Sequence, residues 1–221
     1  MDLINIAAGV AANQIIELFK GPKEHIAAIL SVPILQYRLK QDIKTLQKAQ
    51  ELVKAHGISV KALNLKVLTP LLENAILEDE PVLQNLWANL IVNTIDSSKN
   101  YSSTIFINIL KEITAQEAEL LLYLNNVQKA SNEQVFKRFP ELQSFMAINL
   151  RRLGLLEIQD GPDWGEPIIL DGSGAFDPPI EREEKTKRDY LFGDKTFHKD
   201  YNQYLSPLGK EFLNAVMITG E

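Results

Sequence analysis

Three histidines are the residues of this chain best suited to acid–base or metal chemistry. His25, His56 and His198 stand on three separate predicted elements, without the H-x-x-x-H spacing that brings two imidazoles to one metal ion. Cysteine is absent, which excludes thiol nucleophiles, thiolate metal sites and disulfides. The sequence also lacks a nucleophile elbow, a P-loop and a dinucleotide-binding fingerprint. It therefore predicts a protein that is not an enzyme and that needs no cofactor.

A group of acids forms the other candidate for chemistry. Glu73, Glu78, Asp79 and Glu80 could in principle hold a hard cation, which takes several oxygen ligands. Three of these acids directly precede Pro81, where the pattern predicts the start of a helix. Free backbone N–H groups and the helix dipole favour carboxylates at such a start. Helix capping explains the acids without a metal, so we predict no metal site.

A row of lysines is the strongest candidate for binding an anion. Lys40, Lys44, Lys48 and Lys54 fall within about a third of the circumference of a helix predicted over residues 34–56. Between residues 31 and 66 seven basic residues stand against two acids, although the whole chain has a net charge of −6. This face could bind a polyanion or an anionic membrane surface. A solvated helix face explains the same lysines, and we favour that interpretation.

The bulk properties of the chain limit its class and location. Its 221 residues allow one large core or two small ones. The first residues lack the basic start and apolar run of a secretory signal, and the longest other apolar run, residues 26–35, is too short to cross a bilayer. Together with the absence of cysteine, this predicts a cytoplasmic protein without a transmembrane segment.

Helical periodicity dominates the first half of the chain, and residues 1–112 are predicted to form an all-helical domain. Thr69-Pro70 is expected to open one of its helices, and Pro81 the next. In the helix after Pro81, apolar residues form a core stripe, and Asn85, Asn89 and Asn93 form a row of amides on the other side. That row could bind a partner helix, but we favour a solvated face. The predicted helices cover residues 2–19, 22–31, 34–56, 69–77, 81–95 and 103–112.

Residues 113–221 are predicted to form a winged helix-turn-helix module. Two capping boxes, Thr114-x-x-Glu117 and Ser131-x-x-Gln134, open its first two helices. The expected third helix, strands and closing helix are residues 141–153, 155–158, 202–205 and 207–217. The segment between the two strands, 160–201, is far longer than an ordinary hairpin loop and is predicted to be an elaborated wing. The overall prediction is thus a mainly α protein of two parts.

The third helix of a winged-helix module often contacts DNA, so the residues on its outward face indicate whether this module could bind DNA. Gln143, Ser144, Arg151 and Arg152 are the candidate DNA-binding residues. The predicted outward face also includes Ala147 and Ile148, and it carries little charge. We therefore favour a structural or protein-binding module over one that recognises DNA.

The central segment resembles a known family. The residues that carry the resemblance are Leu71-Leu72-Glu73-Asn74-Ala75, Leu77-Glu78-Asp79-Glu80, Leu83-x-x-Leu86-Trp87-Ala88-Asn89-Leu90 and Phe106-x-x-Ile109-Leu110-Lys111-Glu112-Ile113-Thr114. Together they resemble the abortive-infection alpha family of bacterial proteins, over about residues 39–153. The resemblance implies a cytoplasmic protein associated with phage resistance. It brings no established catalytic residues.

Two functions follow from these observations. In the first, the protein is a defence component that binds a phage or host protein or associates with itself. In the second, it is a winged-helix regulator that binds DNA. A third possibility, an enzyme or toxin, has less support because no catalytic constellation is found.

Overall fold

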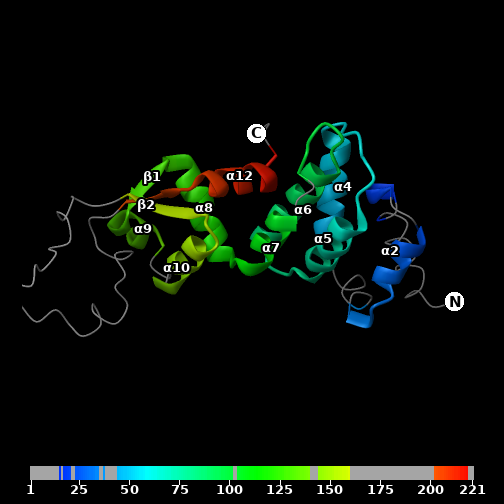
Figure 1. Cartoon of the computed structure of the whole chain (residues 1–221), viewed down its shortest axis with the longest axis horizontal. Coiled ribbons are helices and arrows are strands. Elements are labelled where there is room, and N and C mark those ends of the chain that lie inside the picture. The colour runs from blue at the N-terminus through cyan, green and yellow to red at the C-terminus, as the bar shows by residue number, and fades with distance from the viewer. Residues whose placement is uncertain are drawn as a thin grey trace, which may run out of the picture.

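The structure, a computed structural model, describes residues 15, 17–20, 23–34, 37, 44–101, 104–139, 144–159 and 202–218 (Figure 1). Most of these residues are helical, and one small sheet accompanies the helices, which confirms the mainly α fold class. The elements are α2 (Lys23–Leu30), α4 (Lys44–Ala55), α5 (Leu65–Leu77), α6 (Pro81–Ile95), α7 (Thr104–Glu112), α8 (Ala115–Val127), β1 (Lys129–Ser131), α9 (Asn132–Arg138), α10 (Ser144–Arg152), β2 (Leu156–Gln159), β3 (Asn202–Leu205) and α12 (Pro207–Val216).

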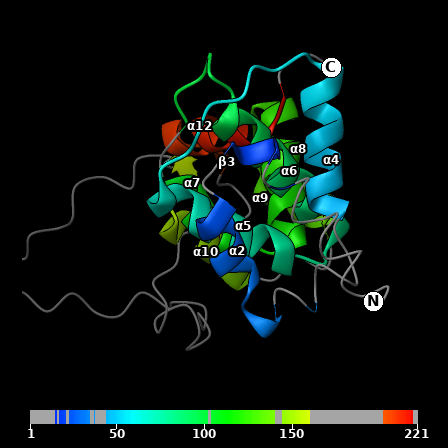
Figure 2. The same ribbon diagram turned by 90° about the vertical axis from the view of Figure 1, so that its right-hand side faces the viewer.

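Helix α6 is the centre of the molecule. It packs against α4, α5, α7, α8 and α12, and most of its residues are buried. Apolar residues occur on nearly every side of this helix, and such a helix is stable only when other elements surround it. The predicted core stripe, which includes Trp87, is confirmed as buried. Figure 2 views the molecule from the end that carries α2 and α4, with α2 and α5 near the viewer and α4 along one edge.

Helix α5 begins earlier than its proline suggests. The prediction that Thr69-Pro70 opens this helix is wrong, because Asn64 caps it and accepts a hydrogen bond of 2.9 Å from Lys66 N. Pro70 lies inside the helix and cannot donate a backbone hydrogen bond. The additional first turn buries Val67 and Leu68, so apolar contact offsets the lost hydrogen bond.

Helix α4 represents the second half of the helix predicted over residues 34–56. Its predicted end is confirmed, because Gly57 has φ +60° and Ile58 N donates to Val53 O at 3.0 Å, which is a Schellman closure. Residues 38–43 lie outside the described residues, as do most of the predicted first helix and all of 160–201.

The elements from α8 onwards follow the order helix, strand, helix, helix, strand, strand, helix. Both predicted capping boxes are confirmed, at Thr114 and at Ser131. The sheet is antiparallel with the order β1-β3-β2. Strand β3 matches its predicted range. Strand β1 was not predicted, and it consists of three residues that pair with β3.

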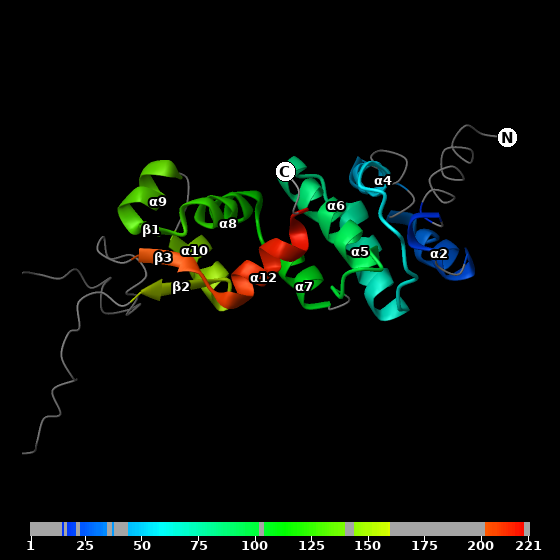
Figure 3. The ribbon, with the colours of Figure 1, turned by 90° about the horizontal axis from the view of Figure 1, so that it is seen from above.

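Helix α12 joins the sheet to the helices of the first half. At its start, Ser206 Oγ accepts a hydrogen bond from Gly209 N at 2.9 Å and donates to Gly154 O at 2.5 Å. Further along, Phe212 packs against Phe106 of α7, with ring centroids 6.3 Å apart. Figure 3 shows α12 between the sheet and α6. The buried apolar residues form one cluster that runs through both halves of the chain. The division into residues 1–112 and 113–221 stays a prediction.

Gln128, directly before β1, has a backbone conformation that suits glycine. Its φ of 69° and ψ of −43° lie in a region that side chains disfavour. We expect Gln128→Gly to raise the free energy of unfolding by roughly 0.5–1 kcal/mol, measured by urea denaturation, because relief of strain exceeds the entropy cost of glycine. Gln128→Ala is the control and should not stabilise the protein, since alanine keeps the Cβ. Equal effects of the two variants would contradict the strain.

Candidate binding surfaces

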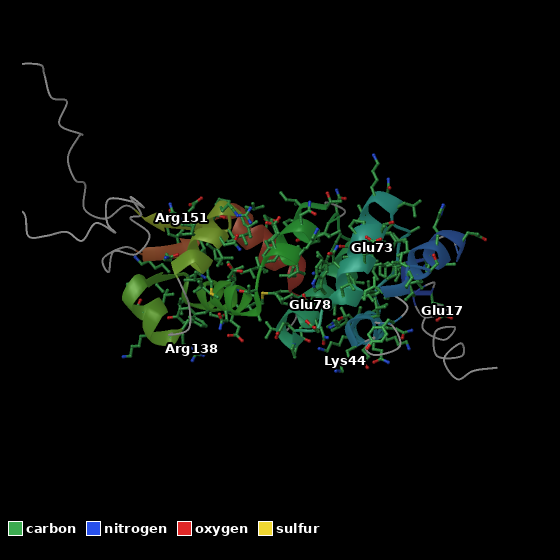
Figure 4. All side chains as sticks on the ribbon, turned by 90° about the horizontal axis from the view of Figure 1, so that it is seen from below. Glu17, Lys44, Glu73, Glu78, Arg138 and Arg151 are labelled. Atoms are coloured by element: carbon green, nitrogen blue, oxygen red, sulfur yellow. The ribbon has the colours of Figure 1, made fainter. Side chains whose placement is uncertain are left out.

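The lysine row of α4 serves partly to hold the fold together. Lys48 Nζ donates to Asn85 Oδ1 of α6 at 2.7 Å, so this lysine links two packed helices. Lys44 and Lys54 are exposed, and Figure 4 labels Lys44. Lys40 lies outside the described residues. Of the four candidate residues the structure thus places two on an exposed surface and one in a contact between helices.

Helix α10 buries a wider stripe than its sequence pattern predicts. The prediction that Ala147 points outward is wrong, because its exposed fraction is 2%. This helix packs against both α8 and β2, so residues on two sides of it are covered. Ile148 is the exposed apolar residue at its centre, and Arg151 is exposed in its last turn. Of the other candidates, Gln143 and the side chain of Ser144 lie outside the described part of the structure.

Arg152, the last candidate for DNA contact, is engaged within the chain. Its Nη2 lies 2.5 Å from Glu112 Oε2, and its Nε and Nη2 donate to Asn149 Oδ1 at 3.1 and 2.9 Å. These contacts tie the end of α10 to the end of α7. A guanidinium held by a carboxylate is a poor ligand for phosphate, since the carboxylate offsets its charge.

Polar contacts continue from this ion pair into the start of α8. Asn149 Nδ2 donates to Glu117 Oε1 at 3.0 Å, and Glu117 Oε2 accepts a hydrogen bond of 2.7 Å from Thr114 N. Glu117 is 2% exposed, so its carboxylate needs these donors. The capping box thus also positions α10. The sequence predicts the box but not its contact with Asn149, because that contact depends on how two helices pack.

Two basic residues of this region, Arg138 of α9 and Arg151 of α10, lie apart from each other. Arg138 ends α9 and lies over the Phe139 ring, 5.8 Å from its centroid. Figure 4 shows Arg138 and Arg151 at opposite edges of this part of the molecule. A surface for duplex DNA needs its positive charges along one track of phosphates. Arg138 and Arg151 therefore do not lie along one such track.

Asn93 connects the first half of the chain to its C-terminal helix. The prediction of a solvated amide row is wrong at this position, because Asn93 is completely buried. Its Nδ2 donates to the carbonyl oxygens of Ala215 at 2.8 Å and Met217 at 2.9 Å, and its Oδ1 accepts a hydrogen bond of 2.7 Å from Lys99 Nζ. Helix α12 lies over this side of α6, so the partner helix of the amide belongs to the same chain. We call these contacts the Asn93 clasp.

The loop after α6 carries a buried carboxylate. Asp96 is 8% exposed and accepts hydrogen bonds from Ser98 N at 2.8 Å and Ser98 Oγ at 2.7 Å. Burial opposes ionisation of Asp96, but the two Ser98 hydrogen bonds and the charges of Lys99 and Lys61 outweigh it and lower the pKa below the usual 3.8. The Asp96 carboxylate is therefore ionised at neutral pH and stabilises this loop.

The lowered pKa of Asp96 leads to an expected pH dependence. A carboxyl with a lower pKa in the folded state adds stability above its unfolded pKa and loses it as the pH falls through the folded pKa. We expect Asp96→Asn to be less stable than the unchanged protein at pH 7, and the difference to shrink below about pH 3.8. Urea denaturation at several pH values measures it. A difference that stays constant from pH 7 to pH 3 would contradict the assignment.

The prediction that the acids before Pro81 cap α6 is wrong for Glu80, the N-cap residue, because its side chain makes no hydrogen bond to the start of that helix. Glu78 Oε1 accepts hydrogen bonds from Asp79 N and Glu80 N, both at 3.0 Å. Pro81 is the first residue of α6, as predicted. Among the described residues no group of histidine, aspartate or glutamate side chains is arranged to hold a metal ion. In the same part of the chain no helix combines the length and apolar character needed to span a bilayer.

Comparison with known proteins gives one match. The chain matches no curated protein and no solved structure. The model of the family described as abortive infection alpha matches residues 35–216, which include every element from α4 to α12. Because this match covers most of the chain, the protein belongs to the abortive infection alpha family.

Proposed function

We propose that this protein is a non-enzymatic component of abortive phage infection and that it acts in the cytoplasm by binding a protein, either a phage or a host factor. Membership of the abortive infection alpha family supports the role in defence. The absence of cysteine fits a reducing compartment. The three histidines stand on separate predicted elements and cysteine is absent, which supports binding over catalysis.

We also propose that residues 113–221 form a winged helix, after an all-helical domain of residues 1–112. The order of the elements from α8 to α12 and the sheet order β1-β3-β2 support this assignment. The proposed wing, residues 160–201, connects β2 to β3 and lies outside the described residues.

One observation carries the choice of a protein partner over DNA. Arg152, at the end of the proposed recognition helix, is paired with Glu112, while Ile148 is exposed at the centre of the same helix. A DNA-binding helix presents donors and positive charge to the groove, whereas an exposed isoleucine beside a neutralised arginine suits a protein surface.

Two variants in a phage-sensitive bacterial strain test this function. The first replaces residues 162–199 with a short Gly-rich turn between β2 and β3, and the second is Arg151→Ala. We propose that the long segment between β2 and β3 is a contact surface for the protein partner. We therefore expect the first variant to lose both phage protection and a cross-linked protein complex that forms during infection, and Arg151→Ala to keep both. Plaque counts and cross-linked pull-downs measure these results.

The opposite pattern would support DNA binding. If the purified protein shifts duplex DNA at about 150 mM salt, and Arg151→Ala abolishes both the shift and the phage protection, the proposal of a protein partner is wrong. An enzyme or toxin would be indicated if expression without phage halted growth and one polar substitution that leaves the fold intact removed that effect.

A further inference from the structure

A stripe of four exposed residues crosses from α7 to α10. Ile105 and Glu112 are seven residues apart on α7, and Ile148 and Arg152 are four apart on α10, so the members of each pair share a helix face. The contact of 2.5 Å between Glu112 Oε2 and Arg152 Nη2 joins the two faces. We call these residues the α7–α10 stripe. Figure 1 shows both helices in succession along the lower side of the molecule.

The α7–α10 stripe has apolar ends and a charged centre. Ile105 and Ile148 are each 43% exposed. The side chains of Glu112 and Arg152 are 45% and 58% exposed. At 1.5 Å per helical residue, the α7 segment from Ile105 to Glu112 is about 10 Å long and the α10 segment from Ile148 to Arg152 is about 6 Å long.

We propose that this stripe is the contact between two copies of the chain, related by a two-fold axis near the ion pair. A two-fold contact brings the same patch from both copies together in opposite directions. The stripe has the order apolar, acid, base, apolar, from Ile105 through Glu112 and Arg152 to Ile148. In the reversed direction each acid meets a base, and Ile105 meets the other copy's Ile148. The patch is therefore complementary to itself.

The same order disfavours other occupants of this surface. DNA or an anionic membrane would meet Glu112 at the centre of the patch, and Arg152, the cation of the stripe, is already paired with that acid. Between two copies, the two ion pairs become a square of alternating charges that fixes the register. The isoleucine ends, which are exposed in one chain, are then removed from water.

Charge reversal provides a test with an internal control. Glu112→Arg makes the centre of the stripe wholly basic, and Arg152→Glu makes it wholly acidic. We expect each purified variant to dimerise at least tenfold more weakly than the unchanged protein, because like charges meet across the axis. An equimolar mixture of the two variants should recover dimers, since each acid again meets a base. Sedimentation equilibrium over a range of concentrations measures the dissociation constants.

Two further variants separate the interface from effects on folding. Ile148→Asp should abolish the dimer, and Leu77→Asp, at an exposed apolar residue of α5 outside the stripe, should leave it intact. Far-UV circular dichroism and thermal unfolding check that all variants fold. Ile148→Ser replaces Ile148→Asp if the latter does not fold.

Three results would overturn the proposal. The first is that the wild-type protein stays monomeric up to about 0.5 mM. The second is that Glu112→Arg or Arg152→Glu alone dimerises as strongly as the wild-type protein. The third is that both variants fold but their equimolar mixture stays monomeric. The inference shares one observation with the proposed function, the exposed Ile148 beside the paired Arg152, and it assigns that face to a second copy of the chain rather than to a phage or host protein. The phage protection experiment uses residues 162–199 and Arg151, which lie outside the stripe, so either proposal can fail alone.

Discussion

Gly209→Ala is expected to destabilise the protein by ~3 kcal/mol or more, a large share of the 5–15 kcal/mol typical of a folded domain. A Cβ at position 209 would lie 2.3 Å from Leu155 O and 3.1 Å from Leu155 C. Both are backbone atoms, and Leu155 O is held in place by the hydrogen bond of 3.0 Å that it accepts from Ser206 N. The start of α12 must therefore move away from Leu155. Urea denaturation followed by circular dichroism measures the loss.

Gly57→Ala is the matched control for Gly209→Ala. Gly57 has φ +60°, but a Cβ there would meet nothing within 4 Å. We expect a loss of about 1 kcal/mol, which reflects only the backbone conformation. If Gly209→Ala cost no more than Gly57→Ala, the close approach of α12 to Leu155 would be wrong.

Asn93→Ala is expected to cost about 3 kcal/mol, because it removes every contact of the Asn93 clasp. The carbonyl oxygens of Ala215 and Met217 would lose their donor. Lys99 Nζ would lose its acceptor in a half-buried position. Urea denaturation gives the stability. Hydrogen exchange should in addition become faster for the amides in the last turn of α12, since the clasp holds that end against α6.

Asn85→Ala, on the same helix and in the same row, is the control. It removes the exposed contact with Lys48 and should cost less than about 1 kcal/mol. Its effect on hydrogen exchange should be confined to α4 and α6. Equal losses for the two asparagines, or unchanged exchange in α12 after Asn93→Ala, would show that the clasp does not hold the C-terminal helix.

The ends of helices are predictable here where a side chain satisfies the backbone locally. Thr114 and Glu117 lie three residues apart, so their reciprocal hydrogen bonds depend on nothing distant in the chain. The same holds for Ser206 before α12 and for Gly57 after α4. Helix α5 shows the limit of this approach, because Pro70 is a strong local signal and buried apolar residues before it extend the helix.

The binding surfaces depend on contacts between distant residues. The sequence suggests Arg152 as a ligand for DNA, and its real partner, Glu112, is 40 residues away. The lysine row on α4 is visible as a pattern, but the contact of Lys48 with Asn85 requires the packing of α4 on α6. Helical spacing predicts which residues share a face, but it does not predict which other element packs against that face.

The sequence by itself determined the mainly helical class, most helix ends and strand β3, because periodicity and capping act within a few residues of each other. The family came from a resemblance carried by the central segment, which the family match confirms. Only the tertiary structure decided that Asn93 is a buried clasp, that Ala147 faces inward and that Arg152 is paired with Glu112. Each of these depends on the packing of other elements, α12 on α6 for Asn93, α8 and β2 on α10 for Ala147, and α7 beside α10 for Arg152. The burial of a polar side chain is thus a property of its neighbours, which lie far along the chain.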